Sequence, residues 1–441
     1  MDINALLDRI ERREYRVGVI GLGYVGLPLV VAFTSKSFPV LGFDVDREKV
    51  EQVNGGTSYI RHISGHRIAH LVETGLLEAT TDFSRCAEVD ALLICVPTPL
   101  TEHRAPDLDY VIETARAVAP HLRPGQLVVL ESTTYPTTTE DILRTELEAH
   151  GLQAGTDFLL AYSPEREDPG NPDFSTGRIP KVVGGLDETS LRVADTLYRQ
   201  IVPATVPVRD TRTAEAVKLT ENIFRSVNIA LVNELKLIYA RMGIDIWEVI
   251  EAAKTKPFGY MPFYPGPGLG GHCIPIDPFY LTWKAQEYGC PTRFIELAGE
   301  INTAMPGYVV ERLTLALNDR GRVLHGARVL LSGLAYKKNV GDPRESPAFV
   351  LMRLLTERGA AVDYYDPYIP VVPPMRAYAE FEGRTSIAWD PARIGGYDAV
   401  LVVTDHDCVD YAALVDAAAL VVDTRNATRG LPGAEAKVVR A

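Results

Sequence analysis

Short apolar runs recur along the first half of the chain, and each is followed by polar, glycine or proline residues. Their lengths are typical of buried strands. They cover 16–20, 40–43, 91–96, 127–130 and 158–161. Helical connections are expected between them, the first over 27–35. This alternation predicts a parallel, doubly wound sheet, in which ligands bind beyond the carboxyl ends of the strands.

A single long helix is expected in the middle of the chain, over 211–242. Asp210 or Thr211 would cap it, and Gly243 would end it. Its apolar residues recur at helical spacing: Leu219, Ile223, Val227, Ala230, Leu231 and Ile238. Such a length is unusual for a connection within one sheet, so we expect this helix to link two domains. More helix to 253 precedes a Gly- and Pro-rich loop over 256–278, whose aromatic residues indicate order.

A second alternating pattern begins near residue 328. Its strand-like runs cover 329–331, 361–365, 399–403 and 420–422. The predicted fold class is therefore α/β, with two Rossmann-like doubly wound parallel-sheet domains joined by the long helix and a helical middle domain. We place the domains at 1–205, 206–312 and 313–441.

Composition narrows the range of partners. The 441 residues fit two or three domains, and the formal net charge of −13 disfavours binding to nucleic acid or to an acidic membrane. A small anionic substrate is still allowed, because it responds to local charge. No apolar run reaches the ~18 residues that a membrane span needs. The 5 cysteines form no C-x-x-C pair, so we expect no disulfide framework, no metal site and a reducing, cytoplasmic compartment.

A glycine motif follows the first predicted strand. Gly21, Gly23 and Gly26 form G-x-G-x-x-G between a strand and a helix. In this motif the first glycine permits the turn, the second admits a pyrophosphate, and the third lets helix and strand pack closely. Asp44 ends the second strand, where a carboxylate binds both ribose hydroxyls and repels a 2′-phosphate. The cofactor is therefore expected to be NAD.

Cys273 lies in a glycine-rich loop, in the stretch Gly270-Gly-His-Cys-Ile-Pro-Ile-Asp277. A helix starting near Pro275 would place its N-terminus close to the thiol and lower the thiol's pKa. A thiolate can add to an aldehyde as a thiohemiacetal, which hydride loss converts to a thioester that water hydrolyses to a carboxylate. On these residues alone, a small buried apolar role is an equal alternative for Cys273, and His272 reads as structural or solvated.

Three further polar residues complete a candidate catalytic set. Lys218 and Asn222 lie four positions apart on the long predicted helix and share a face, where they could stabilise an oxyanion. Glu165 follows a strand and could act as a base or position a water. For each of these residues taken alone, a solvated surface position is the competing interpretation.

Taken together, the motifs resemble those of the UDP-glucose/GDP-mannose dehydrogenase family, from Gly21 nearly to the end of the chain at Asp423. They are Val96-Pro-Thr-Pro99, Glu131-Ser-Thr-Thr-Tyr-Pro136, Ser163-Pro-Glu165, Ala216-Val-Lys-Leu-Thr-Glu-Asn222, Gly270-Gly-His-Cys273 and Lys337-Lys-Asn-Val-Gly-Asp-Pro-Arg-Glu-Ser346. The resemblance implies that the first domain binds NAD, the last binds the nucleotide, and the long helix builds a homodimer. It also implies two successive oxidations without release of the aldehyde.

The resemblance assigns roles residue by residue. Cys273 matches the nucleophile and Asp277 the aspartate that orients water or moves a proton. Lys218 and Asn222 match the oxyanion pair, and Thr134 and Glu165 match residues that hold water and assist hydrolysis. The expected cofactor-binding residues are Gly21, Gly23, Tyr24, Val25, Gly26, Asp44, Lys49, Val96, Pro97, Thr98, Ser132 and Arg344. The expected substrate-binding residues are Glu165, Lys218, Asn222, Phe263, Tyr264, Gly268, Gly270 and Lys337.

Ile276 bears on the choice of sugar. Glucose-specific members of the family usually carry a lysine at this position, just before the aspartate. The sequence around it is closer to the bacterial branch that oxidises UDP-N-acetylglucosamine, which is our first choice, with UDP-glucose or dTDP-glucose next. A two-electron alcohol dehydrogenase and an inactive NAD-binding regulator are the competing functions.

Overall fold

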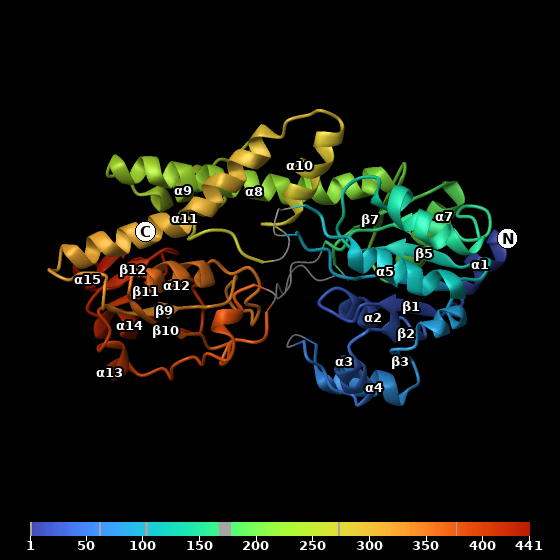
Figure 1. The fold of residues 1–441 in the computed structure, drawn as a ribbon, viewed down its shortest axis with the longest axis horizontal. Coiled ribbons are helices and arrows are strands. Elements are labelled where there is room, and N and C mark those ends of the chain that lie inside the picture. The colour runs from blue at the N-terminus through green and yellow to red at the C-terminus, as the bar shows by residue number, and fades with distance from the viewer. Residues whose placement is uncertain (1, 61–62, 102–104, 167–177, 272–273, 376) are drawn as a thin grey trace. The chain divides into compact units, whose positions relative to one another are not determined.

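The computed structural model describes the whole chain except residues 1, 61–62, 102–104, 167–177, 272–273 and 376. The chain divides into two compact units. Unit 1 consists of Met1–Glu221 with Phe279–Cys290, and unit 2 of Asn222–Pro278 with Pro291–Ala441. Each unit is described on its own below (Figure 1).

Unit 1 is built on an eight-stranded sheet with the order β3-β2-β1-β4-β5-β6-β7-β8. The strands are β1 (Val17–Ile20), β2 (Val40–Phe43), β3 (Leu77–Thr80), β4 (Ala91–Ile94), β5 (Leu127–Leu130), β6 (Leu159–Tyr162), β7 (Lys181–Gly185) and β8 (Thr205–Val208). All neighbouring pairs are parallel except β6 and β7, where Ala161 faces Gly185 in an antiparallel pair. The sheet is thus doubly wound and mostly parallel, as predicted, but β7 and β8 run opposite to the other strands.

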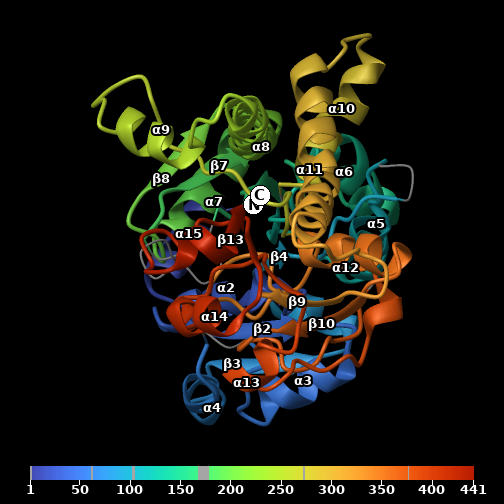
Figure 2. The same cartoon turned by 90° about the vertical axis from the view of Figure 1, so that its left-hand side faces the viewer.

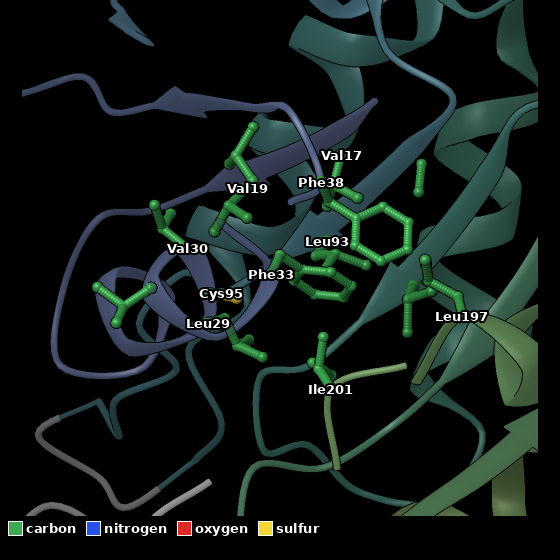
Figure 3. Close-up of a cluster of buried hydrophobic side chains, with 14 of the residues drawn as sticks. Val17, Val19, Leu29, Val30, Phe33, Phe38, Leu93, Cys95, Leu197 and Ile201 are labelled. Atoms are coloured by element: carbon green, nitrogen blue, oxygen red, sulfur yellow. The ribbon is translucent and has the colours of Figure 1, made fainter. Parts of the chain in front are cut away.

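Both faces of this sheet are covered, which explains why β1, β4, β5 and β6 are buried at every position. Figure 3 shows the core on one face, where Val30 and Phe33 of a helix and Val17 and Leu93 of the strands belong to one buried cluster. That face is covered by α1 (Ile3–Glu11), α2 (Gly26–Thr34), α3 (Arg47–Asn54), α4 (Gly65–Glu73) and α7 (Glu188–Tyr198). The other is covered by α5 (Asp109–Val118), α6 (Arg144–Leu147) and the short turns η1 (Phe83–Glu88), η2 (Ala119–His121), η3 (Thr138–Leu143) and η4 (Glu148–His150).

Four helices, the first and last of them long, form the middle of the chain. They are α8 (Thr211–Arg241), α9 (Ile246–Ala253), α10 (Asp277–Glu287) and α11 (Arg293–Asn318). The helix α8 starts where Asp210 accepts the backbone N–H of Thr213 at 2.8 Å, a side-chain cap at its first turn. The long helix and its Asp210 cap are therefore confirmed. This helix runs from unit 1 into unit 2.

Unit 2 contains a five-stranded, fully parallel sheet with the order β10-β9-β11-β12-β13. Its strands are β9 (Arg328–Ser332), β10 (Ala361–Tyr365), β11 (Ala399–Val402), β12 (Val421–Asp423) and β13 (Val438–Arg440). Apolar side chains of α11 and of α12 (Pro347–Glu357) cover one face, and those of α13 (Pro391–Ile394) and α14 (Tyr411–Ala417) cover the other. Figure 2 shows the ribbons of these helices around the strands. The short elements η5 (Ala379–Phe381) and α15 (Ala434–Lys437) complete the unit.

The predicted fold class is confirmed, and the differences lie at the edge strands and at β7, next to one of them. The sequence patterns did not predict β3, β7, β8 or β13. Among the described residues, no helix is long and apolar enough to cross a membrane. Within the same part of the chain, no cluster of three or more His, Cys, Asp or Glu side chains could hold a metal ion. The domain boundaries at 205/206 and 312/313 stay predictions.

Candidate active site

The glycine motif forms a tight turn between β1 and α2. Gly21 has a φ of +89°, and a Cβ there would lie 2.8 Å from the carbonyl oxygen of Cys95. A Cβ at Gly26 would collide with the backbone of Gly21, while one at Gly23 would meet nothing within 4 Å. Gly21 and Gly26 are therefore required by the turn itself, and Gly23 faces open space. This arrangement fits the three glycine roles of a dinucleotide site, in which the pyrophosphate approaches the second glycine.

Asp44 follows β2 and is 6% exposed. Its Oδ2 accepts the backbone N–H of Leu22 at 2.8 Å, and its Oδ1 accepts that of Asp46 at 2.9 Å. The Lys49 ammonium lies 3.8 Å from Oδ2. The carboxylate is thus fixed against the glycine turn, where a Rossmann fold binds ribose hydroxyls and where its charge disfavours a 2′-phosphate.

The residues after β4 and β5 form a second wall beside the turn. The Ser132 hydroxyl donates to the carbonyl of Val96 at 2.7 Å, and the Thr98 hydroxyl donates to that of Thr133 at 2.8 Å. The Thr134 hydroxyl is buried and has no hydrogen-bond partner within the described part of the chain. These bonds fix the loop backbone, and the buried Thr134 oxygen fits a site for a small polar guest such as water. The other predicted residues of this region are half-buried or exposed: Tyr24, Val25 and Pro97.

Glu165 and Lys218 meet beyond the end of β6. The Lys218 ammonium donates to the backbone carbonyl of Glu165 at 2.5 Å, and only 8% of Lys218 is exposed. The Glu165 carboxylate accepts the backbone N–H of Arg166 at 2.8 Å and lies 3.5 Å from the ammonium of Lys181. Two of the predicted catalytic residues are therefore in direct contact within unit 1. Lys181, which the sequence patterns did not single out, is the third member of this group.

Asn222 and Asp277 meet in unit 2. The Asn222 amide donates to Asp277 Oδ2 at 2.6 Å, and both side chains are buried. Asp277 is the first residue of α10, and Asn222 follows Lys218 by one turn of α8. The bond uses one N–H of the Asn222 amide, and the amide oxygen and the second N–H are not used by it. Cys273 and His272 lie outside the described residues, so the nucleophile assignment stays a prediction.

The loop after α9 is held by two asparagines that the sequence patterns did not predict. Asn233 of α8 accepts the backbone N–H of Gly266 at 3.0 Å and donates to Asn302 of α11 at 2.9 Å. Asn302 in turn donates to the carbonyl of Ser226 at 3.2 Å. All three hydrogen bonds are buried, so they hold the middle of the loop against two helices. An asparagine within a helical pattern carries no local signal for such a role.

The glycines of this loop are packed against the C-terminal part of unit 2. A Cβ at Gly270 would lie 2.8 Å from the Cβ of Tyr336, and one at Gly266 would lie 2.6 Å from the Arg425 guanidinium. Gly268 has a φ of +134°, which other residues rarely adopt. These positions need glycine because of close packing and backbone conformation. Their substrate-binding role, predicted for Gly268 and Gly270, stays a prediction.

Phe263 and Tyr264 are both engaged by the helical part of unit 2. The ring of Phe263 packs edge-on against Phe224 of α8, with centroids 5.7 Å apart. The ring of Tyr264 stacks on Trp247 at 5.5 Å, and its hydroxyl donates to Glu251 at 2.8 Å. Both side chains therefore anchor the loop to α8 and α9.

The segment that carries Lys337 is fixed by a buried histidine. His406 accepts the backbone N–H of Asn339 on its Nδ1 at 2.9 Å, so its proton is on Nε2, which lies 3.1 Å from Asp366 Oδ2. Asn339 has a φ of +63°, and its side chain donates to Asp407 at 2.6 Å. This network holds the backbone just after Lys337.

Arg344 pairs with a carboxylate of its own loop. Its Nε donates to Asp342 Oδ1 at 2.9 Å and its Nη2 donates to Oδ2 at 2.6 Å. The guanidinium is thereby oriented by a neighbour two residues away. Its predicted position near the cofactor phosphates stays a prediction.

Family models match the chain in three consecutive parts. The NAD binding domain of the UDP-glucose/GDP-mannose dehydrogenase family matches residues 15–202, the central domain residues 212–304, and the UDP binding domain residues 330–430. A relative, UDP-N-acetyl-D-glucosamine 6-dehydrogenase of Pseudomonas aeruginosa, is 37% identical over 396 residues, which are 89% of this chain and 91% of that protein. The chain belongs to the UDP-glucose/GDP-mannose dehydrogenase family.

Other relatives of this dehydrogenase extend the match over nearly its full length. UDP-N-acetyl-D-mannosamine dehydrogenase of Salmonella typhimurium is 35% identical over 430 residues, covering 94% of this chain and 99% of that protein. The solved structure of UDP-D-ManNAc dehydrogenase from Pyrococcus horikoshii superimposes with a TM-score of 0.85 at 33% identity, covering 95% and 97% of the two chains. The resemblance inferred from the motifs, the enzyme class and the NAD cofactor are therefore confirmed.

One structural residue of this dehydrogenase lies just before the predicted oxyanion pair. Glu215 of α8 is buried and accepts the backbone N–H groups of Thr137 and Thr139 at 2.7 and 2.9 Å. Thr137 has a φ of +89°, so the carboxylate stabilises a strained turn that follows Thr134. Burial raises the pKa of Glu215 to about 8. No spacing rule in the sequence links residues so far apart.

Proposed function

We propose that this dehydrogenase oxidises the primary alcohol at C6 of a UDP-sugar to a carboxylate, with Cys273 as the covalent nucleophile. The family match over most of the chain carries the proposal. The buried hydrogen bond between Asn222 and Asp277 also supports the proposal. It orients the Asn222 amide one helical turn from Lys218, so that both side chains of α8 can donate hydrogen bonds to a reacting oxygen. NAD, when bound, accepts the hydride in each of two oxidations.

The residues of the chain have distinct tasks in this proposal. The Cys273 thiolate adds to the aldehyde formed by the first oxidation and gives a thiohemiacetal. Loss of a second hydride and of the hydroxyl proton gives a thioester, and one water then releases the carboxylate and the thiol. Lys218 and Asn222 donate hydrogen bonds to the developing oxyanions. Glu165 accepts a proton from the attacking water, which Thr134 helps to hold. Each sugar consumes one water and two NAD.

UDP-N-acetylglucosamine is the first choice of substrate. Ile276 stands where glucose-specific members usually have lysine, and the relative in Pseudomonas aeruginosa is named as a dehydrogenase of this sugar nucleotide. The relative in Salmonella typhimurium is named for the mannosamine epimer, so the proposal is an N-acetylhexosamine nucleotide with the glucosamine form first. UDP-glucose and dTDP-glucose are the runners-up.

A substrate panel tests the proposal directly. NADH formation is measured with UDP-N-acetylglucosamine, UDP-N-acetylmannosamine, UDP-N-acetylgalactosamine, UDP-glucose, dTDP-glucose and GDP-mannose, and products are identified by mass spectrometry. We expect two NADH and one uronic acid per sugar. One NADH per sugar with an aldehyde or ketone product indicates a two-electron dehydrogenase instead. Tight NAD binding without turnover of any sugar indicates the inactive regulator.

The Cys273→Ser variant tests the nucleophile. We expect it to bind NAD normally and to form no acid, because a serine hydroxyl is a weaker nucleophile than a thiolate at neutral pH. Cys408→Ser is the matched control, since Cys408 is an exposed free cysteine. An acid yield equal to wild type in Cys273→Ser overturns the covalent mechanism.

We also propose that the enzyme forms a homodimer through α8 and works in the cytoplasm. Phe224, Leu231 and Ile238 follow one another at intervals of seven and are 48%, 49% and 46% exposed. Residues seven apart lie on the same side of a helix, so they form an apolar stripe of the kind that marks an interface. The four described cysteines are all free, which fits a reducing compartment.

A further inference from the structure

A buried group of charges lies beyond the ends of β5 and β6 in unit 1. Lys181 is 4% exposed, and its ammonium lies 2.7 Å from Glu131 Oε2 and 3.5 Å from Glu165 Oε2. The Tyr198 hydroxyl donates to the other oxygen of Glu131, and the Tyr198 ring lies 5.1 Å from the ammonium. The Lys181 ammonium therefore lies next to two carboxylates. Glu131 is buried in the core, and Glu165 belongs to the proposed catalytic set.

The geometry separates the roles of the two carboxylates. Glu131 is 1% exposed and is satisfied by Lys181 and Tyr198. The side chain of Glu165 is 12% exposed, and its two oxygens face the Lys181 ammonium and the backbone N–H of Arg166. Glu131 is thus a structural counter-ion that keeps Lys181 charged, while Glu165 lies at the boundary of the core.

The position of Lys181 follows from the direction of β7. Lys181 is the first residue of β7, which runs antiparallel to β6, so Lys181 lies beside the carboxyl end of β6. Its ammonium also donates to the carbonyl of Pro164 at 3.3 Å, next to Glu165. A parallel β7 would begin beside the amino end of β6 instead. The antiparallel direction of β7 therefore places the Lys181 ammonium next to the carboxyl end of β6.

Lys181 stays positively charged next to Glu165 although it is buried. Burial lowers the pKa of Lys181, but the neighbouring carboxylates outweigh this effect and raise it, so the side chain is a permanent cation. In a site with little water, an opposite charge within 4 Å attracts a carboxylate more strongly than it does at a surface, and Lys181 lies 3.5 Å from Glu165 Oε2.

We propose that Lys181 is a positioning residue for the hydrolysis step, holding the Glu165 carboxylate in place at the end of β6. This inference rests on the proposed function, in which Glu165 accepts a proton from the attacking water. Lys181 transfers no proton itself. Among the described residues, other charged or titratable groups near this cluster include Glu131 after β5, Cys95 after β4, Tyr198 of α7, Lys218 of α8 and Arg166.

The test compares the rate of acid release with the rate of the first hydride transfer. Both rates are measured in full-length enzyme with NAD and the sugar nucleotide of the panel that turns over fastest. Lys181→Met removes the cation that holds Glu165, so we expect acid release to slow about tenfold or more while the first hydride transfer stays within about twofold of wild type. Lys181→Arg keeps the charge and should keep acid release within about threefold of wild type.

Two further variants keep the test decisive. Lys181→Met leaves the buried Glu131 without its cation, which can prevent folding. The double variant Lys181→Met with Glu131→Gln removes both charges of the pair and should fold and show the same slowing of acid release. Lys36→Met is the matched control, because Lys36 is an exposed lysine of the same unit, and both of its rates should equal those of wild type.

The outcomes distinguish this inference from the proposed function. Glu165→Gln should slow acid release without slowing the first hydride transfer. A Glu165→Gln variant that releases acid as fast as wild type overturns the role of Glu165, and the role of Lys181 falls with it. A slow Glu165→Gln variant together with acid release at the wild-type rate in the double variant overturns only the role of Lys181. Absence of turnover with every nucleotide sugar overturns both.

Discussion

Replacing Asp366 by asparagine removes the charge from a buried carboxylate of unit 2 that accepts four backbone N–H groups. Asp366 Oδ2 accepts the backbone N–H groups of Leu334 and Ala335 at 2.6 and 2.9 Å. Its Oδ1 accepts those of Tyr368 and Ile369 at 2.7 and 3.1 Å. An asparagine has only one oxygen, so in either orientation its NH₂ group faces two backbone N–H donors. No rotation of the side chain relieves the conflict.

The expected cost follows from these bonds. A hydrogen bond to a charged group contributes about 1.5–3 kcal/mol, and the substitution loses two of them on one side. We therefore expect Asp366→Asn to lower the free energy of unfolding of unit 2 by about 3–5 kcal/mol. It should also loosen the backbone after Lys337, because Asp366 holds His406 and His406 accepts the N–H of Asn339.

Urea unfolding followed by tryptophan fluorescence measures this cost. Trp389 reports on unit 2 because its ring lies 5.0 Å from that of Tyr365, and replacing Trp247 and Trp283 by Phe leaves it as the sole tryptophan signal. Asp363→Asn is the matched control on the same strand. Asp363 is exposed and accepts one bond, from the Tyr397 hydroxyl at 2.6 Å, which an amide oxygen can also accept. Its cost should be below about 1 kcal/mol.

The pH dependence provides an independent check. Burial opposes ionisation of Asp366, but the hydrogen bonds from His406 and from the backbone outweigh it and lower the pKa of this carboxyl. Because the folded-state pKa is below the unfolded-state value of about 3.9, the stabilisation is present above pH 4 and is lost as the pH falls through the folded-state pKa. The gap between wild type and Asp366→Asn should narrow below pH 4. Equal costs for Asp366→Asn and Asp363→Asn would refute this reasoning.

Three more predictions concern the cofactor, a buried amine and assembly. Asp44→Ala should weaken NAD binding and reduce the preference for NAD over NADP, measured by titration with both cofactors, since it removes the charge that repels a 2′-phosphate. Burial and the nearby Arg425 lower the pKa of Lys236 to about 7, so Lys236→Met should stabilise unit 2 by about 1–3 kcal/mol at pH 7, measured by urea unfolding. Leu231→Glu should convert the proposed dimer to monomers in light scattering, because it charges the apolar stripe of α8.

Each of these has a control and a contradicting result. Asp46→Ala is the control for the cofactor, and unchanged discrimination in Asp44→Ala would contradict that assignment. The folded-state pKa of Lys236 is below its unfolded-state value of about 10.4, so wild-type stability rises between pH 7 and 10; a benefit of Lys236→Met that does not shrink over this range would contradict the burial argument. Val371→Glu, at an exposed site of unit 2, should leave the oligomeric state unchanged. A dimer that persists in Leu231→Glu would show that α8 does not form the interface.

The central strands and the long helix were predictable because their signals are local. The strands β1, β4 and β5 are apolar at nearly every position, as burial on both faces of a parallel sheet requires. The helix α8 shows a cap at Asp210 and regular apolar spacing. Each of these features depends on residues a few positions apart, so the sequence displays it directly.

The edge strands were not predictable in the same way. The strand β8 is only partly buried and contains Pro207, which is tolerated at a sheet edge but weakens a strand pattern. The strand β3 contains polar residues at alternate positions, and β13 has three residues. The antiparallel direction of β7 is set by its connection and its neighbours, and nothing within its own sequence records it.

The sequence by itself determined the cofactor turn, its acidic partner Asp44, and the family to which the enzyme belongs. Their motifs are short, ordered and chemically specific. Tertiary structure alone decided that Lys181 lies between Glu131 and Glu165, and that Asn233 and Asn302 hold the loop at Gly266. These partners are far apart in the chain, and the strength of a buried charge or amide depends on water exclusion by the packed fold, which no local pattern encodes.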